Sequence, residues 1–176
     1  SYGWSDKDGV YSHYQGSGVE LVAVAAVAGA TTAILMPALA KAKKQAKQVV
    51  SMSNMKQIGV ACMLYANDKD GYLPSSLDDS ELKPYLKNVQ KVLVSSRKPK
   101  HFKGPSYVYV KGLNIKMNKP SRIIVAYENP NFLTNSTVAL FLDGHVERMH
   151  ASAFRKSINE TYRSLGREAP EIKFLR

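Results

Sequence analysis

The chain has 176 residues and is strongly basic, with 25 Lys and Arg against 14 Asp and Glu and a formal net charge of +11. Such a surface attracts polyanions, but the charges are spread along the chain, so composition by itself does not establish nucleic-acid binding. The single cysteine, Cys62, excludes an internal disulfide, and its place among apolar residues predicts a small buried side chain.

Residues 1–18 are expected to form a separate N-terminal extension. They combine several aromatic side chains with Asp6, Lys7 and Asp8. A secretory leader usually starts with a net positive segment, so this extension is not typical of one.

The uncharged run Leu21–Ala40 is the most informative segment of the chain. It follows Glu20 and precedes lysines at residues 41, 43, 44 and 47. A helix needs about 20 apolar residues to cross a bilayer, and this run is long enough. Its many small side chains let helices approach closely, which favours an assembly subunit over an enzyme. Glu20 is either a hydrated boundary residue or a functional carboxylate that pairs with a cation or donor nearby.

The helix is expected to continue beyond the apolar run and to span residues 19–66. Proline and glycine weaken helices, and Thr31 and Thr32 are β-branched, so Gly29 and Pro37 predict a loosened stretch over residues 29–37. The second half is predicted to be amphipathic and to lie against the soluble domain, because its apolar residues recur at steps of three or four. These residues are Ala42, Ala46, Val49, Met52, Met55, Ile58, Cys62 and Tyr65.

Residues 67–176 are expected to form a small globular domain. Segments rich in Val, Ile, Tyr and Phe predict strands at residues 106–110, 122–127, 137–142 and 145–149. Asp143-Gly144 predicts a two-residue hairpin between the last two. The predicted fold class is therefore α+β, with a long N-terminal helix, apolar and then amphipathic, packed on a small antiparallel sheet.

Two shorter helices complete the expected domain. One is predicted over residues 77–86, with Pro84 near its end. The other is predicted to start at a Ser152 cap and to stop at Gly166. Its apolar face would consist of Phe154, Ile158, Tyr162 and Leu165.

The sequence gives no complete catalytic or metal-binding pattern, and we expect neither enzyme activity nor a cofactor. His145 and Glu147 alternate along a predicted strand and share a face, but no further ligand completes a metal site. The acidic segment at residues 67–71 is more typical of a solvated turn than of a calcium loop, although weak calcium binding through Asp68 and Asp70 stays open.

The densest run of positive charge lies at residues 97–103. A solvated loop is its simplest interpretation. In a polymer the same run would repeat along the surface and bind DNA or acidic polysaccharide by avidity. The candidate polyanion-binding residues are Arg97, Lys98, Lys100 and Lys103.

Several motifs occur in order along the chain. Gly-Val-Glu-Leu-Val at residues 18–22 is followed by Gly29 and Pro37, then by Asp-Gly-Tyr-Leu-Pro at 70–74 and by Phe-Leu-Asp-Gly-His-Val-Glu at 141–147. This set resembles type IV pilins and type II secretion pseudopilins, in particular a bacterial prepilin-like subgroup with a C-terminal Asp-Gly-His-Val-Glu turn. The resemblance implies a pilin-like fold, and it implies that Glu20 neutralises the N-terminal amine of a neighbouring subunit.

Two features depart from this resemblance. The family's Gly-Phe processing site is replaced by Gln15 and Gly16, and Leu133 stands where the subgroup often has a histidine. The fate of residues 1–18 and the processing site are therefore not predicted.

The sequence thus predicts a structural subunit of an extracellular or periplasmic helical filament, similar to a type IV pilus or pseudopilus. Its main partner would be itself, with the bacterial inner membrane holding it before assembly and pilus or secretion machinery as possible partners. Alternatives are a membrane-anchored basic surface protein that binds polyanions, and a minor pseudopilin of a secretion system. The expected assembly residues are Glu20, Leu21, Val24, Val27, Gly29, Leu35 and Pro37.

Overall fold

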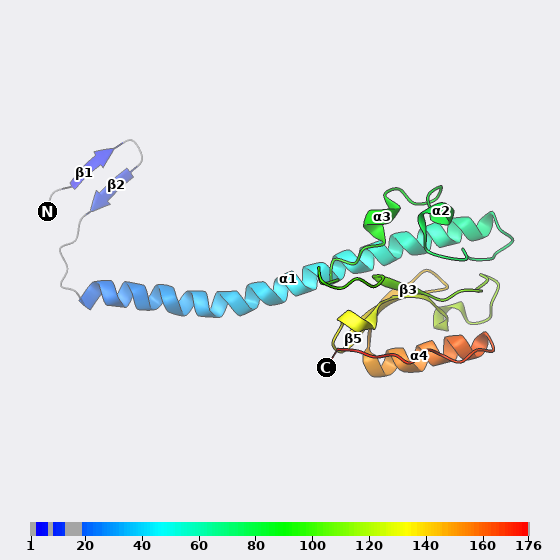
Figure 1. The fold of residues 1–176 in the computed structure, drawn as a ribbon. Helices are drawn as coiled ribbons and strands as arrows, with labels where there is room; N and C mark the ends of the chain where they lie inside the picture. Colours follow the sequence, from blue (N-terminus) through cyan, green and yellow to red (C-terminus); the bar gives the residue numbers. More distant parts are fainter. Residues whose placement is uncertain (1–2, 7–8, 13–18, 176) are drawn as a thin grey trace. The chain divides into compact units, whose positions relative to one another are not determined.

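The structure, a computed structural model, describes the backbone of residues 3–6, 9–12 and 19–175, and side chains from residue 35 onward except that of Asp79. It divides into two compact units, Ser1–Lys43 and Lys44–Arg176. Helix α1 (Val19–Asn67) belongs to both units (Figure 1). The long N-terminal helix of the predicted fold is therefore present.

The first unit contains a small hairpin before helix α1. Strands β1 (Gly3–Asp6) and β2 (Gly9–Ser12) pair antiparallel and form a two-stranded sheet. A two-stranded hairpin is at best marginally stable in water unless it packs against something else. The sequence pattern of residues 1–18 did not predict this hairpin.

Helix α1 is continuous through residues 29–37, where the sequence predicted a loosened stretch. Pro37 lies inside the helix. Proline removes one backbone hydrogen bond, but the surrounding alanines have the highest helix propensity of all residues. The helix therefore continues across the proline in the isolated chain.

Within the part of the chain that the structure describes, no helix has both the length and the apolar character needed to cross a membrane. The side chains of residues 21–34 lie outside the described ones. The membrane-spanning role of Leu21–Ala40 stays a prediction.

The second unit is built on a four-stranded antiparallel sheet with the order β3-β4-β5-β6. The strands are β3 (Tyr107–Tyr109), β4 (Ile124–Glu128), β5 (Ser136–Phe141) and β6 (Val146–His150). All residues of β4 and β5 are buried, because these central strands lie between helix α1 and helix α4 (Ala151–Ser164) (Figure 1). The predicted antiparallel sheet and the α+β class are confirmed.

The turn between β5 and β6 differs from the predicted two-residue hairpin. The Gly144 N–H donates to the Phe141 carbonyl, and the Phe141 N–H donates to the His145 carbonyl, both at 2.9 Å. Three residues therefore form the loop, and only Gly144 has a positive φ, 84°. Asp143 keeps a negative φ because a type I turn followed by one left-handed glycine closes the strands.

The shorter helices also differ in extent from the predictions. Residues 77–86 contain only the four-residue helix α2 (Asp79–Leu82), and a second short helix, α3 (Val89–Val92), follows it.

Helix α4 starts one residue before the predicted Ser152 cap, with His150 as its N-cap. Its fully buried residues are Phe154, Ile158 and Thr161. The Thr161 hydroxyl accepts a hydrogen bond from the Ile124 N–H at 2.9 Å, which attaches α4 to β4. Two three-residue 3₁₀ helices, η1 (Pro120–Arg122) and η2 (Pro130–Phe132), lie in the loops on either side of β4.

Candidate self-association surface

The inner face of helix α1 in the second unit packs on the sheet. Met55, Ile58 and Cys62 have no exposed surface. At Gly59 a Cβ atom would lie only 2.7 Å from the Leu140 Cδ1 atom, so glycine permits the close approach of helix and strand. Burial raises the pKa of the Cys62 thiol to about 12, which agrees with the predicted role of this cysteine as a small buried side chain.

The predicted apolar face of this helix is correct only in its C-terminal part. Ala42, Ala46 and Val49 are exposed, whereas Met55 and Ile58 are buried. Each residue advances about 100° around a helix, so a step of three falls short of a full turn by about 60°. The apolar positions from 46 to 58 recur only at steps of three. Their direction therefore rotates from the outer to the inner face.

The outer face of α1 is mixed in the second unit, where exposed apolar residues lie among the exposed Ser53, Lys56 and Gln57. Val49 is 65% exposed, Val60 58% and Leu64 45%. The first unit adds further exposed apolar residues on the same helix, so seven of the ten large apolar side chains exposed in the described part of the chain belong to α1. These seven are Leu35, Met36, Leu39, Val49, Val50, Val60 and Leu64.

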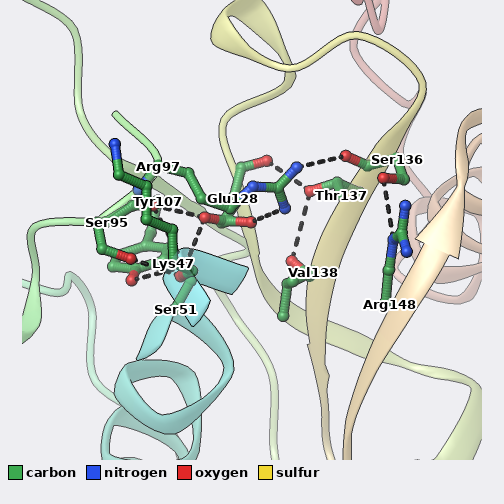
Figure 2. A network of polar contacts seen from close by, with 11 residues as sticks. Lys47, Ser51, Ser95, Arg97, Tyr107, Glu128, Ser136, Thr137, Val138 and Arg148 are labelled. Atoms are coloured by element: carbon green, nitrogen blue, oxygen red, sulfur yellow. Dashed lines mark hydrogen bonds and ion pairs between the residues drawn. The ribbon is translucent and has the colours of Figure 1, made fainter. Parts of the chain in front are cut away.

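A buried carboxylate fixes α1 to the sheet. Glu128, at the end of β4, has no exposed surface. Its Oε1 atom accepts hydrogen bonds from the Ser51 and Ser95 hydroxyls, both at 2.5 Å. Its Oε2 atom lies 2.7 Å from Arg97 Nη1, and the Arg97 side chain is 12% exposed. Figure 2 shows Ser51 of α1 directed toward this carboxylate.

Further polar contacts surround this pair. The Tyr107 hydroxyl lies 3.3 Å from the Ser51 hydroxyl, and burial raises the pKa of Tyr107 despite that contact. The Ser96 hydroxyl donates to the Lys47 carbonyl at 2.5 Å, which ties the loop after α3 to α1. Thr137 Oγ1 donates to the Glu128 carbonyl at 2.8 Å. These contacts join helix α1, the loop after α3 and the central strands β4 and β5 (Figure 2).

The predicted polyanion-binding stretch is not one exposed patch. Arg97 pairs with Glu128 and its side chain is only 12% exposed, so polyanion binding by Arg97 stays a prediction. Lys98 is half-buried, with its Nζ atom 5.8 Å from the centre of the Phe102 ring. Lys100 and Lys103 are exposed. The sequence could not show this division, because the partner of Arg97 lies 31 residues further along the chain.

The described residues contain no group of three or more His, Cys, Asp and Glu side chains that could hold a metal ion. In the acidic segment considered for calcium, Asp68 accepts a hydrogen bond from the Tyr85 hydroxyl at 2.7 Å. His145 stacks on Phe141, with ring centres 4.1 Å apart, and its Nδ1 atom lies 2.5 Å from Asp143. These contacts stabilise the hairpin turn, which matches the structural interpretation of His145.

The predicted assembly residues are only partly described. Leu35 and Pro37 are exposed, whereas the side chains of Glu20, Leu21, Val24, Val27 and Gly29 lie outside the described ones. Sequence reasoning missed the outward direction of Val49, Val60 and Leu64. Comparisons with protein-family models, curated proteins and solved structures found no match. The function is therefore argued from the chain's own surfaces.

Proposed function

We propose that this chain is a structural subunit that assembles into a helical filament through the exposed apolar face of helix α1. The observation that carries the proposal is the concentration of exposed apolar side chains on this one helix, seven of the ten in the described part of the chain. Exposed apolar patches of this kind mark interaction sites, because water is a poor solvent for them.

The energy available is large enough for stable assembly. Complete burial of a fully exposed Val, Leu or Met side chain contributes about 1.5–3 kcal/mol, and these seven side chains are 45–72% exposed, so together they can supply about 6–13 kcal/mol per subunit. Association costs about 4–15 kcal/mol in lost freedom of motion. The described part of α1 can therefore offset most or all of that cost before the apolar run at residues 21–34 is counted.

A membrane anchor explains only part of this surface. Lysines at 41, 43, 44 and 47 end the apolar run, and an anchor would place these charges at the edge of the bilayer. Val49, Val60 and Leu64 follow the lysines and are still exposed. Residues beyond the bilayer edge need a protein partner to leave water, and a neighbouring copy with the same helix offers one.

The resemblance to type IV pilins and pseudopilins supports the same proposal. In a filament of this kind each helix contacts neighbours through different parts of its surface, so the contact is head-to-tail and does not close into a ring. Glu20 would then pair with a neighbouring subunit. The filament would lie outside the bacterial inner membrane, at the cell surface or in the periplasm.

The test uses purified full-length protein transferred from detergent into buffer and examined by negative-stain electron microscopy and sedimentation. The native chain should form filaments that sediment. Val60→Asp and Val49→Asp should abolish them, because each places a charge in the contact. Both side chains are exposed in the monomer, so neither change should lower the urea midpoint of the second unit.

Val94→Asp is the matched control, since Val94 is 53% exposed and lies outside α1. It should assemble as the native chain does. The proposal is refuted if the native protein stays monomeric after detergent removal, or if Val94→Asp and Val60→Asp disrupt assembly equally. Monomers that remain bound to lipid vesicles would favour the membrane-anchored alternative.

A further inference from the structure

The outer edge of strand β3 carries backbone groups that no other strand in the described part of the chain covers. β3 is the first strand in the order β3-β4-β5-β6, so only one of its edges is paired. Val108 of β3 lies opposite Tyr127 of β4. Two residues further along in each direction, the two segments are hydrogen-bonded: the Val110 N–H donates to the Val125 carbonyl, and the Asn129 N–H donates to the Ser106 carbonyl. Antiparallel pairs alternate between bonded and non-bonded residues. The N–H and C=O groups of Tyr107 and Tyr109 therefore point away from β4.

Apart from its length of only three residues, this edge lacks the features that usually protect an edge strand. Natural sheets block strand addition with charged residues, proline or bulges at their edges. The opposite edge strand, β6, contains Glu147, Arg148 and His150. Strand β3 has the sequence Tyr-Val-Tyr, without charge or proline. The two edges of the same sheet thus differ in the property that controls strand addition.

A groove of about 520 Å³ runs beside β3. Its volume is within the range of about 300–1,000 Å³ that is usual for ligand sites. Residues 105–109 contribute to its lining, and Leu77, Leu93 and Val94 supply apolar surface. Val94 is one of the few large apolar residues exposed outside α1 in the described part of the chain.

Several polar side chains line the groove. The Ser106 hydroxyl is buried and has no hydrogen-bond partner among the described residues. Lys98 and Lys111 lie on either side of β3 in the sequence, and both line the groove. Its acidic member, Asp78, accepts hydrogen bonds from the Ser76 and Ser80 hydroxyls, both at 2.6 Å. Hydrogen bonds from Ser76 and Ser80 lower the pKa of Asp78 to about 2, so Asp78 stays negative, and together with Lys98 and Lys111 it leaves the groove with a net charge of +1.

We propose that β3 is a docking site for an extended peptide segment of a partner protein, which adds to the sheet as a fifth strand. The backbone groups of Tyr107 and Tyr109 would bond the incoming main chain, as in other cases of strand addition. Apolar side chains at alternate positions of the peptide would enter the groove, and carboxylates at its ends would meet Lys98 and Lys111. This goes beyond filament assembly, which uses α1.

The test measures binding of a fluorescent peptide, acetyl-Glu-Val-Thr-Val-Thr-Glu-amide, to the full-length Val60→Asp protein by fluorescence anisotropy. Amide hydrogen exchange locates the contact. Binding should slow exchange at the Tyr107 and Tyr109 amides and leave the Val108 amide, already paired with β4, unchanged. N-methylation of the two valines should weaken binding about tenfold, because it removes main-chain donors.

Charge reversal tests the ends of the site. Lys98→Glu combined with Lys111→Glu should weaken the acidic peptide about tenfold and strengthen a peptide with lysine ends by a similar factor. Val94→Asp should also weaken binding but leave filament assembly of an otherwise native chain intact, so failure of this proposal is distinct from failure of the filament proposal.

Three results would overturn the inference. The first is binding without slower exchange at Tyr107 and Tyr109, and the second is equal affinity for the N-methylated peptide. The third concerns the occupant: if a peptide with the sequence of residues 3–12 binds more tightly than the acidic peptide, the site serves a second copy of this chain and not a different protein.

Discussion

The ion pair between Arg97 and Glu128 gives the sharpest prediction for the stability of the second unit. Arg97→Met keeps much of the aliphatic stem and removes the charge. Glu128 would then be a fully buried carboxylate held only by the Ser51 and Ser95 hydroxyls. Loss of one partner from a buried pair costs about 3–5 kcal/mol. Since both hydroxyl donors remain, we expect a loss near the lower end, about 3 kcal/mol.

The reciprocal change should cost less. Glu128→Gln preserves shape and leaves an unpaired guanidinium, but Arg97 is 12% exposed and close to water. We expect about 1–2 kcal/mol, the usual cost of a lost charge-assisted hydrogen bond. In the double variant no buried charge is left unpaired, so its loss should be smaller than the sum of the two single losses, which a double-mutant cycle measures.

Urea unfolding followed by near-ultraviolet circular dichroism reports on the buried tyrosines of the second unit. With a slope of about 2 kcal/mol per molar urea, a loss of about 3 kcal/mol lowers the midpoint by about 1.5 M. Lys100→Met is the matched control, because Lys100 is an exposed cation in the same loop. If Arg97→Met shifts the midpoint no more than Lys100→Met, the buried pair does not hold the fold and the reasoning fails.

Two further changes test other parts of the second unit by the same assay. Gly59→Ala should lower the free energy of unfolding by about 1 kcal/mol. The close contact of the new methyl group with Leu140 costs about 1–3 kcal/mol, whereas the higher helix propensity of alanine regains about 1 kcal/mol. A stabilised variant would show that Leu140 moves away from the new methyl group at little cost. The second change is Asp143→Asn. Burial opposes ionisation of Asp143, but hydrogen bonds from the His145 backbone and ring hold the pKa of Asp143 below its usual value. Its carboxylate therefore contributes stability above the ordinary aspartate pKa of about 3.9 and loses that contribution as pH falls through the lower folded-state pKa. Since this side chain is about one-third exposed, we expect Asp143→Asn to cost less than about 1 kcal/mol at pH 7 and nothing at pH 2; a difference that stays constant with pH would contradict this.

The sheet could be predicted from sequence because its signals are local. Each of the four predicted strands overlaps an observed one, because β-branched and aromatic residues are enriched in strands. The turn was harder. Asp143-Gly144 fits both a two-residue turn and a three-residue loop with a bulge, and the choice depends on how β5 and β6 align.

The buried network and the outer face of α1 depend on contacts that sequence does not show. Glu128 reads as the polar end of a strand, and only the fold brings Ser51, Ser95 and Arg97 to it, from 31 to 77 residues away. The apolar positions of α1 fit one face at steps of three or four. These positions rotate gradually around the helix axis. Which of them are buried depends on where the sheet contacts the helix, and the sequence does not show this.

The proposed assembly would depend on both faces of α1. A neighbouring copy that contacts the outer face can hold the globular domain in a fixed position only if the inner face does not slide on the sheet. Apolar packing alone allows small shifts, because Met and Ile contacts are not directional. Glu128 accepts directional hydrogen bonds from Ser51 of the helix and from Ser95 of the adjoining loop, and its Arg97 partner fixes the carboxylate plane. In the proposed filament, the buried pair would therefore also fix the register of helix and sheet that every subunit has to share.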